Sequence, residues 1–396
     1  MQELAADLAR QILTEAGRYL VVQGDRAYFL DPVFGIVRNR VNAEICKSML
    51  RTGDGRYAER MLNYMLEHQN ADGSWNEIHV NYNQPSALIT AFIGDALLHA
   101  YDRYPHPGAL KTARDYVLSC EMRPGYYLKS TRYTADHLNV DASCGAFLAH
   151  YGRVFSDEEC IAAAERAAKN VCMHQKTGGA YPYAADKGTY PYPFTVPCIH
   201  YQGVTMYYLA QVQDVLEEAW IDESLKAGAA WLASAQKPDG RFDWSRSGLM
   251  FAYYLTGAYA FAYAAFVYAS RWDQAYTAHA GLCLDRLNAN RSGIMLRWES
   301  GRPDDLPAAV TVTAKTAGIG NFPFRHRAFR FGYGMYRQIA RTRYSPAAES
   351  EGFALLCRLL NISASTVEPS KNFPDLFMTS EVLDCLTRAS AMGEFT

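Results

Sequence analysis

A turn built around glycine recurs along this chain and strongly limits what the chain can fold into. In the stretch "HQNADGSW" (68–75) an apolar helix ends, a polar pair follows, and a glycine stands two residues before a tryptophan. Similar turns recur at intervals of 52, 54, 61 and 53 residues, and their glycines are Gly73, Gly125, Gly179, Gly240 and Gly293. Glycine directly after a helix supplies the left-handed stop that ends it. Asp-Gly or Pro-Gly before an aromatic residue is typical turn chemistry.

A second apolar helix follows each turn, so the repeated unit is helix, glycine turn, loop and helix in about 54 residues. We expect these second helices at about 84–101, 136–152, 198–218, 249–269 and 326–342. The same pattern extends to 2–19 with 36–50, and to 346–360 with 375–389. Only the stretch 308–315 has the composition of a β-strand.

Six or seven such hairpins can close into a double ring or stack as an open solenoid. Open solenoids usually have shorter repeats and short connections, whereas the loops here are long and aromatic. We therefore predict an all-α fold of one domain over 1–396, a closed ring in which outer and inner helices alternate. The second helix of each pair has more apolar and small residues, so these helices should form the inner wall.

Composition excludes some classes of function. The 39 basic and 41 acidic residues give a net charge of −2, which provides no electrostatic case for a nucleic-acid partner. The nine cysteines are scattered and form no C-x-x-C pair, as expected of free thiols in a reducing compartment. The first helix lacks the basic flank and apolar run of a signal peptide, and no stretch has eighteen uninterrupted apolar residues. We expect a cytoplasmic protein without a membrane span.

The turn sequences also resemble those of known proteins. "HQNADGSW" (68–75) and "AQKPDGRFDW" (235–244) are similar to the Q-x-x-D-G-x-W turn of the (α/α) toroid superfamilies. These superfamilies include terpenoid cyclases, protein prenyltransferases, polysaccharide lyases and six-hairpin glycosidases. The resemblance covers most of the chain as a repeat pattern and implies a closed (α/α)6-type toroid. It selects no single family, and a fold does not determine the chemistry.

In such a ring the loop after each glycine turn leads into the N-terminus of an inner helix. These loops should therefore meet at one mouth, where helix dipoles favour anionic ligands. Our candidates for catalysis in these loops are His200, Tyr201, His137, Asn139 and Tyr133. Our candidates for substrate binding are Trp75, Glu77, His79, Asn81, Tyr82, Asp136, Tyr192, Trp244, Trp298, Glu299, His326, Arg327 and Arg330.

These residue types favour an enzyme that acts on an acidic, uronate-containing carbohydrate. Tryptophan and tyrosine rings stack on sugar faces, and arginine binds carboxylates through two hydrogen bonds. Proton abstraction in a β-elimination or epimerisation needs a base, for which His200 or Tyr201 is suited, and an acid, for which Tyr133 or Tyr201 is suited. Asn139, His137 and Arg327 would neutralise the carboxylate. Hydrolysis by two carboxylates is the other chemistry that fits, with candidates Glu77, Asp136, Asp141, Asp243 and Glu299.

Two other functions stay open. One is a terpenoid cyclase or prenyltransferase, although the chain has no D-x-D-D motif and keeps only the Asp pair of "RPDDLP" (302–307). The other is a toroid without catalytic activity that binds a glycan or a protein. No metal-ligand spacing, phosphate loop or dinucleotide motif is present in the sequence. We therefore expect no cofactor and no metal, while a metal site assembled across loops from three histidines such as His137, His200 and His326 stays open. We expect a small molecule or oligosaccharide as the partner.

Overall fold

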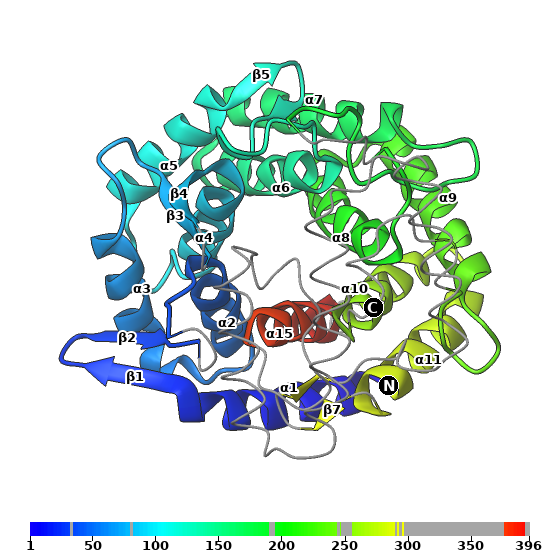
Figure 1. Cartoon of the computed structure of the whole chain (residues 1–396), viewed down its shortest axis with the longest axis horizontal. Coiled ribbons are helices and arrows are strands. Elements are labelled where there is room, and N and C mark those ends of the chain that lie inside the picture. Colours follow the sequence, from blue (N-terminus) through cyan, green and yellow to red (C-terminus); the bar gives the residue numbers. More distant parts are fainter. Residues whose placement is uncertain are drawn as a thin grey trace, which may run out of the picture.

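The structure, a computed structural model, describes residues 1–31, 35–79, 82–189, 195–243, 246, 256–289, 291–292, 295–296 and 376–392. Its helices form two concentric layers (Figure 1). The inner layer consists of α2 (Asn39–Arg51), α4 (Ala87–His99), α6 (Leu138–Phe155), α8 (Ile199–Leu216), α10 (Thr256–Ala269) and α15 (Leu376–Met392). The outer layer consists of α1 (Gln2–Ala16), α3 (Ala58–Glu67), α5 (Pro107–Ser119), α7 (Glu158–Met173), α9 (Ala219–Ala235) and α11 (Ala275–Ala289).

The inner helices follow one another around a ring. Each packs against the next in chain order, and α15 packs against both α10 and α2. The outer helix α1 packs against α15, so the first helix of the chain completes the outer layer beside the last described helix. The predicted ring of alternating outer and inner helices is confirmed. The expected helices at 326–342 and 346–360 and the strand at 308–315 lie outside the described residues, and the single domain over 1–396 stays a prediction.

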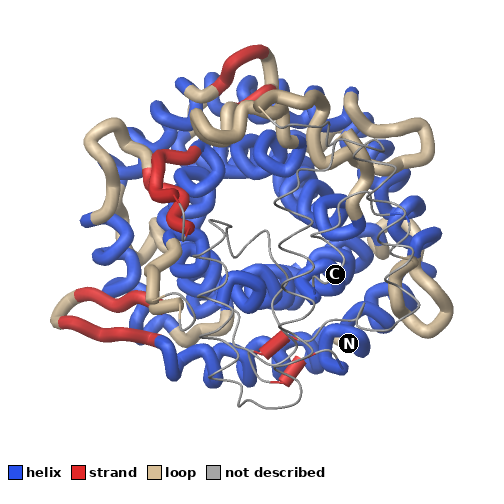
Figure 2. Tube along the Cα trace, viewed as in Figure 1, coloured by secondary structure: helices blue, strands red, loops and turns tan. Residues whose placement is uncertain are grey.

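Short β-hairpins occupy loops that we expected to be irregular (Figure 2). Four antiparallel pairs are described: β1 (Leu20–Gln23) with β2 (Arg26–Phe29), β3 (Trp75–His79) with β4 (Tyr82–Ser86), β5 (Glu121–Arg123) with β6 (Tyr126–Tyr127), and β7 (Arg291–Ser292) with β8 (Met295–Leu296). The expectation of an irregular loop between the turn at 68–75 and the helix at about 84–101 was therefore wrong, and α4 begins at Ala87. The segment has no regular apolar alternation, and its strands are fixed by mutual pairing, with Trp75 opposite Ser86. No described helix has the length and apolar content needed to cross a membrane.

One hydrogen bond recurs at five of the inner helices and sets how each turn meets the ring. The backbone N–H of the aromatic residue after the turn or strand donates to the side chain of the fourth residue of the inner helix. The bonds measure 2.7–3.4 Å and join Phe29 to Asn42, Trp75 to Thr90, Tyr127 to Asp141, Tyr181 to Gln202, and Phe242 to Tyr259. The acceptor differs in every repeat, so what is constant is a polar oxygen at that position.

The turn glycines are needed because the backbone makes a close approach there. Gly179 has a φ of +87°, and a Cβ at this residue would lie 2.1 Å from the carbonyl oxygen of Ala227 on the next outer helix. The side chain of Gln175 donates to the carbonyls of Gly179 and Ser224, at 3.0 and 2.8 Å, and so ties the turn to that helix. The glycine and glutamine of the repeat therefore pack one hairpin against the next.

Gly179→Ala should destabilise the fold by at least roughly 1–3 kcal/mol, because the new methyl group is strained at positive φ and meets backbone. The adjacent Gly178→Ala is the matched control, because Gly178 is exposed and a Cβ there meets nothing within 4 Å. Urea denaturation of both variants measures the difference. Equal stabilities would contradict the packing role of the turn.

Candidate functional site

A stripe of equivalent positions on the inner helices faces the axis of the ring. The residues at positions 2, 6, 9 and 13 of each helix are spaced four, three and four apart, which keeps them on one face. Position 2 carries Arg40, Leu88, Asn139, His200, Gly257 and Phe377. Position 9 carries Lys47, Asp95, Ala146, Tyr207, Ala264 and Asp384. Contacts across the ring, described below, show that this stripe points inward.

Charged side chains meet at position 9. The Nζ of Lys47 lies 2.8 Å from Oδ2 of Asp95 and 3.3 Å from Oδ1 of Asp384, and Lys47 is completely buried. The hydroxyl of Tyr207 donates to Oδ2 of Asp384 at 2.9 Å. Because α10 stands between α8 and α15 in the ring, the bond from Tyr207 to Asp384 reaches across its interior.

A second contact crosses the ring on the other side of α8. The rings of Tyr208 on α8 and Phe92 on α4 have centroids 5.6 Å apart, although α6 stands between these helices. Tyr208, like Tyr207, is almost fully buried. We call the group of residues that joins α2, α4, α8 and α15 across the ring the floor: Lys47, Phe92, Asp95, Tyr207, Tyr208 and Asp384.

Above the floor, towards the N-termini of the inner helices, lies an ion pair network. Arg40 stands 2.8 Å from Glu44 and 2.7 Å from Glu381, and its guanidinium lies 4.8 Å from the centre of the Phe92 ring. Burial raises the pKa of Glu44, and Arg40 opposes that effect. Charges removed from water in this way are tolerated only when they are paired.

His200 lies at the same level, at position 2 of α8. Its Nε2 is 3.8 Å from Oε2 of Glu381, and only 3% of the residue is exposed. Burial lowers the pKa of His200 to about 3, with a further contribution from Arg40. The imidazole is therefore neutral near pH 7, and it has a nitrogen able to accept a proton.

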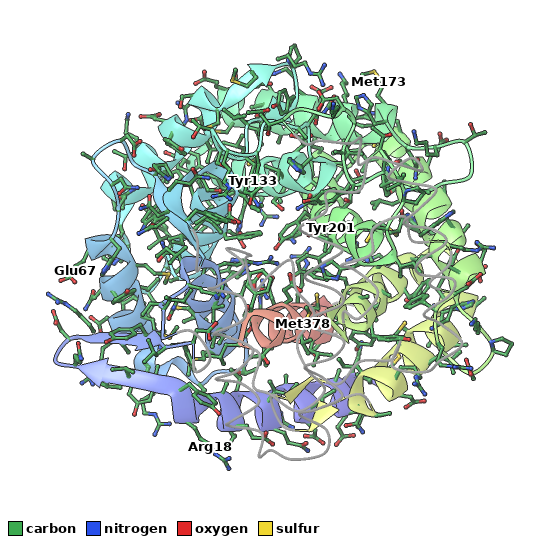
Figure 3. All side chains as sticks on the ribbon, viewed as in Figure 1. Arg18, Glu67, Tyr133, Met173, Tyr201 and Met378 are labelled. Carbon is green, nitrogen blue, oxygen red and sulfur yellow. The ribbon has the colours of Figure 1, made fainter. Side chains whose placement is uncertain are left out.

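A row of aromatic rings connects His200 to the start of α6. His200 lies 5.0 Å from Tyr201, Tyr201 lies 4.3 Å from Tyr183, and Tyr183 lies 5.0 Å from His137, all measured between ring centroids. Burial lowers the pKa of His137 to about 3, helped by the nearby charge of Lys129. The structure thus brings the predicted residues His137, Tyr201 and His200 together. Figure 3 shows Tyr133 and Tyr201 beside the central opening between the helices.

The hairpin β3–β4 adds a second group at this end of the ring. Lys129 Nζ lies 2.9 Å from Oε1 of the buried Glu77 and 5.0 Å from the centre of the Tyr133 ring. The rings of Tyr82 and Tyr133 lie 5.7 Å apart, edge to face. Burial raises the pKa of Tyr82, and the neighbouring Glu77 carboxylate raises it further. We call the end of the ring that carries these two groups the mouth.

Several buried polar atoms of the described residues have no hydrogen-bond partner, and three of them bear on the interior of the ring. They are Oδ1 of Asn139, Nδ1 of His200 and the hydroxyl of Tyr208. All three residues are at least nine-tenths buried. An unpaired buried polar group costs roughly 1–3 kcal/mol. The Tyr208 hydroxyl lies in the floor, whereas Asn139 Oδ1 and His200 Nδ1 lie at the mouth and are the strongest indication that a polar ligand belongs there.

Two predicted binding residues have packing roles instead. Trp75 is fully buried, and its indole N–H donates to the carbonyl of Met65 at 2.6 Å, so it has no face for a sugar. Asp136 is also fully buried and is bound by Arg123 and Asn170. Burial raises the pKa of Asp141, and the nearby carboxylate of Asp136 raises it further. Sequence reasoning did not separate these residues from the site because the same turn supplies both.

Several other candidates cannot be placed. His79 ends β3, and its side chain is not described. The remaining candidates lie outside the described residues: Asn81, Tyr192, Trp244, Trp298, Glu299, His326, Arg327 and Arg330.

Sequence reasoning missed the charged residues of the inner helices themselves, because we treated these helices as an apolar wall. A signal was present. On α2, Arg40, Glu44, Lys47 and Arg51 are spaced four, three and four apart, as expected for one helix face. A charged stripe on a helix that is otherwise buried indicates polar partners inside the ring.

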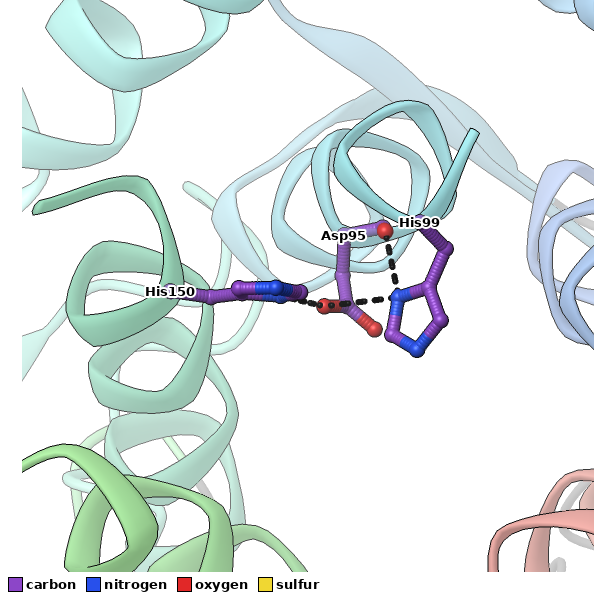
Figure 4. A group of neighbouring side chains, drawn as sticks. All are labelled: Asp95, His99 and His150. Carbon is purple, nitrogen blue, oxygen red and sulfur yellow. Dashed lines mark hydrogen bonds and ion pairs between the residues drawn. The ribbon is translucent and has the colours of Figure 1, made fainter. Parts of the chain in front are cut away.

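At the end of the ring opposite the mouth, Asp95, His99 and His150 form the one group among the described residues with metal-ligand geometry (Figure 4). Asp95 Oδ1 lies 3.0 Å from Nδ1 of His150 and 3.5 Å from Nδ1 of His99. The guanidinium of Arg51 donates to Nε2 of His99 at 3.0 Å, so the ring proton is on Nδ1, which donates to the Asp95 carbonyl. A nitrogen that carries a proton cannot bind a metal. These contacts favour a hydrogen-bonded cluster, and the absence of a metal stays a prediction.

Comparisons with known proteins support the fold. Neither a family model nor a curated protein matches the chain. A cellobiose 2-epimerase from Bacillus thermoamylovorans is similar at a TM-score of 0.57 with 11% identity, over 74% of this chain and 90% of that chain. An unsaturated glucuronyl hydrolase from Bacillus sp. GL1 is similar at 0.55 with 13% identity, over 74% and 86%. A type II terpene cyclase from Scytonema is similar at 0.58 with 12% identity, over 99% of both chains. The chain has the (α/α) toroid fold. At these identities the likeness shows the fold alone, and the fold serves different chemistries.

Stability should fall as the pH is lowered from about 6.5 towards 4. His99, His137 and His200 have folded-state pKa values of about 4, 3 and 3, against 6.5 for a free side chain, mainly because burial disfavours the charged form. The unfolded chain therefore binds protons first, and each histidine contributes up to about 1.4 kcal/mol per pH unit in that window. Urea denaturation at pH 7 and pH 5.5 measures this loss, and His200→Gln should reduce it. Stability that is unchanged between these pH values would contradict the burial of neutral histidines.

Lys47→Met should destabilise the fold by about 3–5 kcal/mol at pH 7, because it leaves Asp95 buried without its lysine and Asp384 with Arg51 as its remaining cation. Lys47 holds the pKa of both carboxyl groups below the usual range. The wild type loses this contribution only as the pH falls through and below about 4, whereas the variant carboxylates take up protons at higher pH. The gap in unfolding free energy between variant and wild type should therefore narrow as the pH falls.

The matched control is Lys111→Met. Lys111 pairs with Asp115 at the same 2.8 Å, but its side chain is 70% exposed. An exposed pair contributes less than about 1 kcal/mol. If Lys47→Met and Lys111→Met lose similar amounts of unfolding free energy, burial does not explain the contribution of Lys47 to stability.

Proposed function

We propose that this protein is an enzyme that carries out acid–base chemistry on a carbohydrate bound at the mouth. The observation that carries the proposal is the pair of buried, unpartnered atoms at position 2, Asn139 Oδ1 and His200 Nδ1. His200 lies near the charged groups of Glu381 and Arg40. Sugar hydroxyl groups both donate and accept hydrogen bonds, so a saccharide would satisfy these atoms. A hydrocarbon ligand would leave them unpaired at a cost in free energy.

In this proposal His200 is the base. Its neutral imidazole takes a proton from the sugar, and the carboxylate of Glu381, 3.8 Å away, stabilises the imidazolium that forms. Tyr201 or Tyr133 returns a proton to the product. In an epimerisation the proton is returned to the opposite face of the same carbon, whereas in a β-elimination the leaving oxygen takes it. The amide of Asn139 and the guanidinium of Arg40 stabilise the negative charge that develops.

Positive charge at the mouth supports an acidic sugar as the substrate. The guanidinium of Arg132 lies 5.0 Å from the centre of the Tyr82 ring, and Lys129 lies beside Tyr133. Arg132 is exposed and has no ion pair among the described residues. An exposed guanidinium held over an aromatic ring is well placed to bind a uronate carboxylate.

Hydrolysis is the second chemistry in this proposal. Glu77 and Glu381 are both buried carboxylates near the mouth, and two carboxylates suffice for glycoside hydrolysis. Two of the structures with a similar fold, an epimerase and a glucuronyl hydrolase, act on sugars, which supports carbohydrate as the substrate class. The terpene cyclase of similar fold keeps an isoprenoid substrate as the rival, but the charged and unpartnered groups inside this ring favour the sugar.

His200→Ala should lower turnover at least about 100-fold, because the base is lost, while the variant stays folded. The assay is a panel of uronate oligosaccharides, followed by absorbance of a new C4–C5 double bond, by release of reducing ends and by epimer analysis. His174→Ala is the matched control, since His174 lies at the end of the outer helix α7 and, among the described residues, its side chain bonds to the carbonyl of Asn170 in its own helix.

Each outcome decides between functions. Retained activity of the His200→Ala variant would remove His200 from the mechanism. Turnover of a prenyl diphosphate by the wild type, with no activity on any sugar, would overturn the carbohydrate assignment in favour of a terpenoid enzyme.

A further inference from the structure

The floor divides the interior of the ring along its axis. It connects α8 to α15 through Tyr207 and Asp384, and α15 to α2 and α4 through Lys47. The contact between Tyr208 and Phe92 then connects α4 back to α8. Four of the six inner helices are thus joined across the ring by side chains in direct contact. These side chains are all almost fully buried.

The ion pairs of the floor make it difficult to open. Its central cation has two carboxylate partners, and one of these, Asp384, also accepts a hydrogen bond from Arg51 at 2.7 Å. Opening a passage would separate the buried Lys47 from both carboxylates, which is strongly unfavourable for charges held out of water. A sugar chain provides no charge of the right sign to replace both partners.

The two ends of the ring also differ in their polar groups. At the mouth, Asn139 and His200 each have a buried atom without a partner. At the opposite end, His99 is engaged through both ring nitrogens, by Arg51 and by the carbonyl of Asp95. Arg388 there is paired with Asp214 at 2.7 Å. Ligand binding is therefore favoured at the mouth and not at the opposite end.

We infer that the ring admits a saccharide from the mouth only and only as far as the floor, so that it binds the end of a chain or a free small sugar and not an internal segment. Position 2 lies about 10 Å above position 9 along the helix axis, at 1.5 Å per residue. That depth takes one or two sugar rings. The inference rests on the proposed function and names its substrate as a chain terminus.

The test is the number of protein molecules bound per saccharide chain, measured by isothermal titration calorimetry with the His200→Ala variant to prevent turnover. The probes are oligogalacturonates and malto-oligosaccharides, each as trimer, hexamer and dodecamer. For whichever saccharide series binds, we expect one protein molecule per saccharide at every length. The Kd should change little beyond the trimer. Analytical ultracentrifugation of the complexes gives an independent count.

The outcomes separate the two ideas. A stoichiometry that rises with chain length would show binding to internal segments and would overturn the inference, while leaving the carbohydrate function standing. No binding to either series, in the variant and in the wild type, would count against the proposed function and the inference with it. A folded Asn139→Leu variant that binds the saccharide with the wild-type Kd would overturn the placement of the saccharide at the mouth.

Discussion

Lys47 is a completely buried cation with a carboxylate on each side, and much of the ring depends on it. Asp95 belongs to the next inner helix in the chain, while Asp384 belongs to the last described one. The two ion pairs therefore hold α2 between α4 and α15, where the ring joins its beginning to its end. The same residues form the floor that separates the two ends of the ring. One electrostatic requirement, the pairing of a buried charge, thus underlies both the contact of α2 with α4 and α15 and the floor across the ring.

A second constraint acts in every repeat. The fourth residue of five inner helices accepts the backbone N–H of the aromatic residue that follows the turn or strand. Asparagine, threonine, aspartate, glutamine and tyrosine all serve at this position, because only an oxygen atom is needed. An acidic residue at such a position is then explained without catalysis. The second position of each helix has no such duty, and Asn139 and His200 there each keep a buried polar atom without a partner among the described residues.

Much of the fold could be predicted from the sequence because its signals are local. The glycine turns and the apolar periodicity indicated the hairpins and their alternation, and the positive φ of Gly179 shows why the glycine recurs.

The site could be predicted only in part. His137, Tyr201 and His200 do come together, since inner-helix N-termini must meet at one end. Trp75 and Asp136 were predicted to bind substrate but are fully buried. Their burial depends on the outer helices that pack over the turn, which the local sequence does not show. Glu381 and Asp384 were missed, because their cationic partners Arg40 and Lys47 lie more than 300 residues away in the chain.

The central claim is that a saccharide end lies above the floor, against the unpartnered atoms of the mouth. A crystal structure of the His200→Ala variant with a bound oligosaccharide tests it most directly. The account predicts a terminal sugar ring with a hydroxyl group on Oδ1 of Asn139, near Arg40 and Glu381, and the rest of the chain leading out past Tyr133 and Tyr201. A saccharide bound beside His99 and His150 at the opposite end, or one that passes between Tyr207 and Asp384, would contradict it.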